Sequence, residues 1–170
     1  MVYPTSAHAG VKFREYRFEI KTLVRVIDLL KVGEQIVGPM ELWEKWSMEA
    51  ESVSLLFRDL SETSDRWIDV TKTRWMRVFD TSGKGVKESD PSVDLPRLEE
   101  GCYAEITEVD IHGQPFWTLG LESFARNQPL QENLVRTAQL LLHPESMPMR
   151  LNAADADAYP GFLRKYLQNH

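Results

Sequence analysis

The stretch CYAEITEVDIHGQPFWTLGLESF, residues 102–124, decides the fold. Cys102 to Ile111 and Phe116 to Phe124 are two candidate strands, and His112-Gly113-Gln114-Pro115 between them is a short turn with glycine. Strands joined so closely in sequence pair in an antiparallel manner. The sequence therefore predicts a β-hairpin here, as part of an antiparallel sheet.

The segments before and after this hairpin show both strand and helix patterns. Strands are expected over residues 12–22, 53–60 and 66–79, and helices over residues 130–142 and 162–168. A further helix is expected from Leu23, with apolar residues at helical spacing and Gly33 placed to end it, although the strand could instead continue through Val24. Another helix is expected to begin at Gly38-Pro39 and to bury one face, which consists of Met40, Trp43, Trp46 and Ala50.

Together these segments predict an α+β fold, in which an antiparallel sheet has enough strands to curl into a β-barrel with flanking helices. The chain has the length of a single domain, residues 1–170. Residues 1–11 are expected to be a loose N-terminal arm. Residues 81–100 are polar, contain two prolines and two glycines, and are expected to form a mobile loop.

The composition speaks against several classes of protein. With 42% hydrophobic and 27% charged residues the chain is globular, and its net charge of −6 argues against non-specific binding to nucleic acid. Cys102 is the single cysteine, so an internal disulfide and a multi-cysteine zinc site are both excluded. The sequence contains no apolar run approaching the ~20 residues of a membrane helix and no apolar segment typical of a secretory signal. We therefore expect a cytoplasmic protein without a membrane partner.

Charged residues on the predicted strands are the main candidates for a site. The histidines do not lie at metal-ligand spacing, and neither a GxSxG nor a P-loop sequence is present, so no catalytic residue is assigned. From Tyr16 to Val24 the chain alternates, and Arg17, Glu19 and Lys21 fall on one face of a strand. Such a face can be solvated, which is the commoner case, or can line a barrel that binds a charged ligand.

The other predicted strands carry further charges, which are Arg58, Lys72, Arg74, Glu105, Glu108, Asp110 and Glu122. If the sheet closed with these side chains inward, the cations would neutralise phosphate oxygens. The carboxylates would hold a hard divalent ion that bridges those oxygens. A solvated sheet face explains each strand separately and needs no cavity.

Several segments, in the same order, resemble the CYTH superfamily, the triphosphate tunnel metalloenzymes, which include thiamine triphosphatases and CyaB-type adenylate cyclases. That family opens with an ExExK strand continuing into Phe-Leu-Val. The segment from Arg17 to Val24 is similar, with Glu19 on the second Glu and Lys21 on the Lys, while Arg17 replaces the first Glu.

Later segments extend the resemblance over most of the chain. Residues 57–59 and 68–74 are similar to the family's arginine-containing strand and to the Leu-Thr-x-Lys strand that follows it. Residues 108–113 and 119–122 resemble its hairpin, whose second strand carries a metal-binding glutamate. Residues 158–163 resemble the closing Ser-Tyr-x-x-Leu-Leu of the CyaB-type members.

The resemblance implies an antiparallel eight-stranded tunnel that binds a small-molecule polyphosphate or organic triphosphate. It implies that Mg²⁺ or Mn²⁺ is held by Glu19, Glu108 and Glu122, and that the phosphates contact Lys21, Arg58, Lys72 and Arg74. Water would attack the terminal phosphate, with charge neutralisation as the main catalytic contribution.

Arg17 leaves two alternatives to hydrolysis. A cation in place of the first Glu removes a metal ligand and leaves polyanion binding intact, so the chain could be a non-catalytic barrel that binds an anionic ligand. It could also be a protein-interaction domain with charges on a solvated sheet face, in which the two-tryptophan segment and the 81–100 loop dock a partner. The sequence does not determine the oligomeric state.

Overall fold

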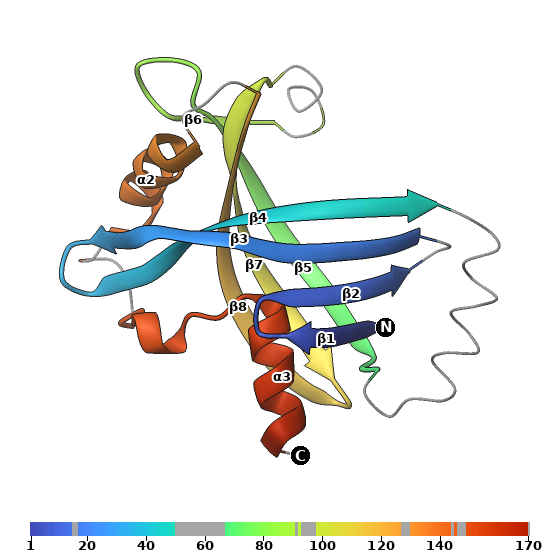
Figure 1. Cartoon of the computed structure of the whole chain (residues 1–170). Helices are drawn as coiled ribbons and strands as arrows, with labels where there is room; N and C mark the ends of the chain where they lie inside the picture. Colours follow the sequence, from blue (N-terminus) through green and yellow to red (C-terminus); the bar gives the residue numbers. More distant parts are fainter. Residues whose placement is uncertain are drawn as a thin grey trace. The chain divides into compact units, whose positions relative to one another are not determined.

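The computed structural model describes residues 1–14, 17–49, 67–90, 92, 98–126, 130–143, 145 and 149–169. Its elements, in chain order (Figure 1), are β1 (Val2–Ser6), β2 (Ala9–Arg14), β3 (Arg17–Val32), β4 (Ile36–Glu49), β5 (Val70–Asp80), β6 (Lys87–Ser89), β7 (Glu100–Ile111), β8 (Gln114–Ala125), α2 (Leu130–Leu141), a 3₁₀ turn (Ala153–Asp155) and α3 (Tyr159–Asn169).

The strands form two four-stranded sheets, in the orders β1-β2-β3-β4 and β6-β5-β7-β8. Where the register is described, neighbouring strands run antiparallel. The predicted α+β class with antiparallel sheets is therefore confirmed. Among the described strands, neither sheet closes on itself into a barrel.

Contacts divide the chain into two compact units. The first unit contains Met1–Leu29, Gly38–Val70 and Ala153–His170, and so holds most of the first sheet together with α3. The second unit contains Leu30–Val37 and Thr71–Asn152, which include the second sheet, α2 and the turn that joins β3 to β4.

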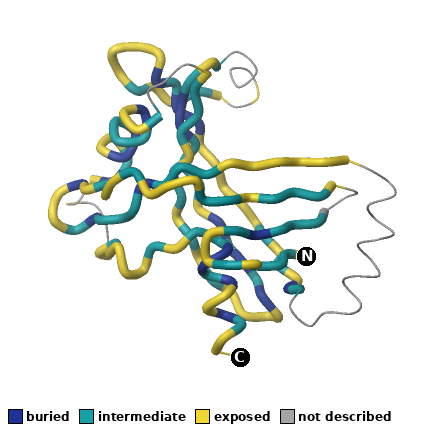
Figure 2. Tube along the Cα trace, in the orientation of Figure 1, coloured by how far each residue is buried: buried dark blue, intermediate teal, exposed yellow. Residues whose placement is uncertain are grey.

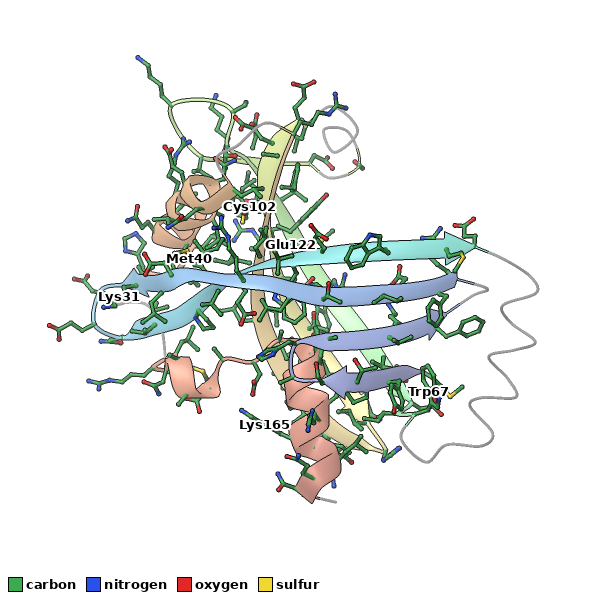
Figure 3. All side chains as sticks on the ribbon, in the orientation of Figure 1. Lys31, Met40, Trp67, Cys102, Glu122 and Lys165 are labelled. Atoms are coloured by element: carbon green, nitrogen blue, oxygen red, sulfur yellow. The ribbon has the colours of Figure 1, made fainter. Side chains whose placement is uncertain are left out.

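In the first unit, α3 packs on the hairpin of β1 and β2. Gly10 on β2 leaves room for this helix, because a Cβ atom at Gly10 would lie 3.1 Å from Pro160 Cγ. The opposite side of the sheet is apolar and carries Phe13 and Phe18, which face each other across β2 and β3. On that side, the rings of Tyr3 and Trp67 lie 5.2 Å apart, and Trp67 is labelled beside β1 in Figure 3.

In the second unit, α2 packs on the β7–β8 hairpin and on the β3–β4 turn. One buried hydrophobic cluster there consists of Val32, Ile36, Ala138 and Leu142. Figure 2 colours the buried residues of the described chain dark blue. The turn is also held by main-chain hydrogen bonds, because Val37 N donates to Leu151 O at 2.7 Å and Leu151 N donates to Gln35 O at 2.9 Å. Among the described residues, no helix has the length and apolar character needed to cross a bilayer.

Several sequence predictions are confirmed by these elements. The hairpin at residues 102–124 is present, with a tighter turn than expected, because Ile111 pairs directly with Gln114. Helices are found at both predicted C-terminal positions, as α2 and α3. The expected strand over residues 66–79 corresponds to β5, whereas the expected strand over residues 53–60 lies outside the described residues.

The two helices predicted between Leu23 and Ala50 were wrong. β3 continues from Arg17 to Val32, and β4 occupies Ile36–Glu49, so this segment is a long hairpin. Gly33 ends the first element as expected, but with φ of 60° it starts the turn of a hairpin. Helical spacing of the apolar residues was outweighed by β-branched residues and by cross-strand pairing.

Two segments expected to be irregular contain strands. Residues 1–11, predicted as a loose arm, hold β1 and the start of β2. Within residues 81–100, predicted as a mobile loop, β6 pairs with β5 from Asp80↔Lys87 to Val78↔Ser89. Arg136 on α2 also holds the start of this segment, because its guanidinium donates to Thr81 O at 3.1 Å and to Gly83 O at 2.8 Å.

Candidate functional site

The first sheet has one charged face, formed by alternate residues of β2, β3 and β4. Antiparallel pairing places Lys12 opposite Glu19 and Gly10 opposite Lys21, so these side chains share a side. Arg17, Glu19 and Lys21 therefore lie on one face, as their spacing predicts. The Lys12 ammonium lies 3.6 Å from the Glu19 carboxylate, and Arg17 pairs with Glu49 of β4.

Lys21 differs from the other cations of this charged face. Its side chain is exposed, and its ammonium lies 5.5 Å from the centre of the Trp43 ring. The indole is held in turn, because Trp43 Nε1 donates to Glu41 Oε2 at 2.8 Å. Across the described part of the chain, none of the salt bridges involves Lys21. An aromatic ring attracts a cation without cancelling its charge, so Lys21 can still pair with an anion.

The second sheet has a charged face of its own. Lys72 and Arg74 alternate along β5 and so point to the same side. Arg74 Nε lies 3.1 Å from Glu105 Oε2 on β7, which places Glu105 on that side too. In the β7–β8 register Glu105 faces Gly120 and Tyr103 faces Glu122, so Glu122 also belongs to this face. Figure 3 labels Glu122 on β8.

Glu105 is the most constrained carboxylate of this face. Its side chain is only 20% exposed, whereas that of Arg74 is 49% exposed. Thr107 Oγ1 donates to Glu105 Oε1 at 3.4 Å, a long contact. Across the strand, Gly120 leaves room for the Glu105 methylenes, since a Cβ atom at Gly120 would lie 3.3 Å from Glu105 Cγ.

Glu108 lies on the opposite side of the second sheet. It faces Trp117 in the register, and Trp117 stacks on Trp75 of β5 with ring centres 5.6 Å apart and planes 20° apart. Both indoles are more than half exposed, at 53% for Trp75 and 62% for Trp117. This face is therefore aromatic, and Glu108 is separated from Glu122 by the sheet itself.

Two of the three predicted metal ligands, Glu108 and Glu122, lie on opposite faces of the second sheet. Glu19 belongs to the first unit, whereas Glu108 and Glu122 belong to the second. Within the described residues, no group of three His, Cys, Asp or Glu side chains could hold a metal ion together.

The predicted phosphate-binding residues that the structure describes belong to both units. Lys21 lies in the first unit, whereas Lys72 and Arg74 lie together in the second. Arg58 lies outside the described residues. Trp43 and Gly120 were not expected near these charges, and Glu105 was predicted only as one of several strand carboxylates. The signal for Glu105 was its place two residues before Thr107 on a strand, but only cross-strand pairing reveals Arg74 as its partner.

Behind the charged face of the second sheet lies a buried thiol. Cys102 is fully buried, and burial raises the pKa of its thiol to about 11, an effect that hydrogen bonds with Thr137 and the Glu122 main chain partly offset. Its Sγ also contacts Tyr103 O at 3.4 Å. A thiol with this pKa is protonated at neutral pH and is a poor nucleophile, so Cys102 has a packing role.

No family model matches the chain, and no curated protein or solved structure is significantly similar to it.

Proposed function

We propose that this protein binds a triphosphate or another organic polyanion through cations on the charged faces of its sheets. The observation that carries the proposal is Lys21, an exposed ammonium above the Trp43 ring that takes part in none of the salt bridges of the described residues. A charge in this setting is available to a phosphate oxygen, and ion-assisted hydrogen bonds are among the strongest in proteins.

The resemblance of the sequence to the triphosphate tunnel metalloenzymes supports the same ligand. By that resemblance Lys21, Lys72 and Arg74 would contact phosphates, and each of the three lies on a strand. A closed tunnel of antiparallel strands is part of this proposal.

The test compares two variants of the same strand that change the charge equally. Lys21→Gln is expected to weaken tripolyphosphate binding about tenfold, because it removes one charge-assisted contact. Lys31→Gln is the matched control, since Lys31 is also exposed on β3 but lies roughly 30 Å further along the strand. Isothermal titration at fixed ionic strength, with sulfate as a competing anion, measures both.

Equal affinities of these two variants would contradict the role of Lys21. A wild-type protein that binds tripolyphosphate no better than sulfate would contradict the proposed function. In that case the charges serve a solvated sheet face, and the protein-interaction alternative is favoured.

Metal-dependent hydrolysis is the second candidate function. It is favoured by Glu105 and Glu122, two carboxylates on the same face as Arg74. Phosphate release from tripolyphosphate and from nucleoside and thiamine triphosphates, with and without Mg²⁺ or Mn²⁺, tests it. Glu122→Gln should abolish release. Binding without release would identify a non-catalytic polyanion-binding protein, which is what Arg17 in place of the first glutamate favours.

A further inference from the structure

The Arg74 guanidinium is already paired with a side-chain carboxylate, that of Glu105. Its Nε lies 3.1 Å from Glu105 Oε2, so the two groups form an ion pair on the Nε side of the guanidinium. A phosphate binds arginine best through two parallel N–H donors of one edge. An incoming phosphate therefore meets a negative charge beside the Nε side of Arg74.

Glu105 is held in this position by its surroundings. Thr107 Oγ1 donates a long hydrogen bond to Glu105 Oε1. The absence of a side chain at Gly120 leaves the space that the Glu105 methylenes occupy. The exposed fractions also differ, with 20% for the Glu105 side chain and 49% for that of Arg74. The Glu105 carboxylate is thus the more buried partner of the pair, and about half of the Arg74 side chain is accessible to solvent.

We propose that Glu105 is an internal counter-ion that occupies Arg74 until a polyanion displaces it. This inference rests on the proposed function, since it concerns how the same face accepts its ligand. The carboxylate takes the place of a phosphate oxygen and lowers the affinity of the face for monovalent anions and for weakly charged ligands. A ligand with several phosphates is expected to displace the carboxylate, because its further phosphates contact other cations such as Lys72 on the same face.

A double-mutant cycle on the full chain tests this role, with tripolyphosphate as the probe and EDTA present to exclude divalent metal. Glu105→Gln keeps the shape of the side chain and removes its charge, and it is expected to tighten binding about threefold to tenfold. Glu100→Gln is the matched control. It changes the net charge equally on the same strand, but on the opposite face, and is expected to change affinity less than twofold.

In an Arg74→Gln background, Glu105→Gln is expected to give no such gain, because the pair it breaks is already absent. Melting temperatures establish that each variant is folded. Glu105→Ala, which also removes the carboxylate, replaces Glu105→Gln if the latter does not fold.

The outcomes separate this inference from the proposed function. If the wild-type protein binds tripolyphosphate and Glu105→Gln behaves like Glu100→Gln, the counter-ion role is overturned and the function stands. Weaker binding by Glu105→Gln also overturns it, because Glu105 would then position Arg74 for the ligand. If neither the wild-type protein nor Glu105→Gln binds tripolyphosphate, both proposals fail together.

Discussion

Cys102 shows how a single side chain responds to the packing of the second unit. Its thiol is fully buried, and Thr137 and the Glu122 main chain offer it hydrogen bonds. Burial disfavours the thiolate more than these contacts favour it, so the pKa rises from the model-compound value of 9.0 to about 11. The native state therefore holds this proton over a pH range in which the unfolded chain releases it.

The proton of the buried Cys102 thiol should make the free energy of unfolding depend on pH in the alkaline range. Its contribution to stability is complete below pH 9 and is lost as the pH rises towards 11, because the native state binds more protons than the unfolded state in that range. The free energy of unfolding should fall by about 2 kcal/mol more in the wild-type protein than in Cys102→Ser. Urea unfolding at a series of pH values measures the difference, and parallel pH profiles would contradict the assignment.

At the scale of an element, the β7–β8 hairpin depends on its two-residue turn. His112 and Gly113 have φ values of 52° and 81°, and positive φ at both central residues is the mark of a type I′ turn. This turn has the twist that the paired strands require, and its second position favours glycine because a side chain strains the backbone there.

Replacing this glycine should destabilise the protein without any steric clash. Gly113→Ala is expected to lower the free energy of unfolding by about 1 kcal/mol, although no atom lies within 4 Å of the added Cβ. Gly85→Ala is the matched control. It also adds a Cβ in open space, but at a glycine without positive φ, and should be neutral. Equal losses in denaturant unfolding would show that the turn conformation is not the cause.

The elements also show what the sequence can and cannot predict. The β7–β8 hairpin and α2 were predictable because a local signal, a glycine turn or a helical apolar pattern, agrees with the tertiary structure. The segment from Leu23 to Val32 was not, since its apolar residues fit helical spacing while pairing with β2 and β4 extends it as a strand. Short-range periodicity contains no information about such pairing.

The candidate site was likewise predictable within one strand but not between strands. Alternation along β3 correctly places Arg17, Glu19 and Lys21 on one face. The partnership of Arg74 with Glu105 joins residues of different strands, so only the register reveals it.

At the scale of the whole molecule, an acidic chain with a net charge of −6 carries its candidate phosphate-binding cations on two sheets. The first sheet contributes Lys21, and the second contributes Lys72 and Arg74. Variants in the two sheets can therefore be compared in the same binding experiment.

Calorimetric titration with tripolyphosphate tests the contribution of each sheet. Lys21→Gln and Arg74→Gln are each expected to weaken binding by about tenfold, because each removes one charge-assisted contact. Melting temperatures establish that each variant is folded. An affinity equal to that of the wild-type protein in either variant would mean that the cation it removes does not contact the ligand.

The stacked indoles of Trp75 and Trp117 give the molecule an internal optical signal. Two aromatic chromophores whose ring centres lie 5.6 Å apart couple their electronic transitions, and the coupling vanishes once the rings separate. Since β5 and β8 flank β7, this signal reports the integrity of three strands at once. Loss of the second sheet could therefore be followed in near-ultraviolet circular dichroism without attaching any label.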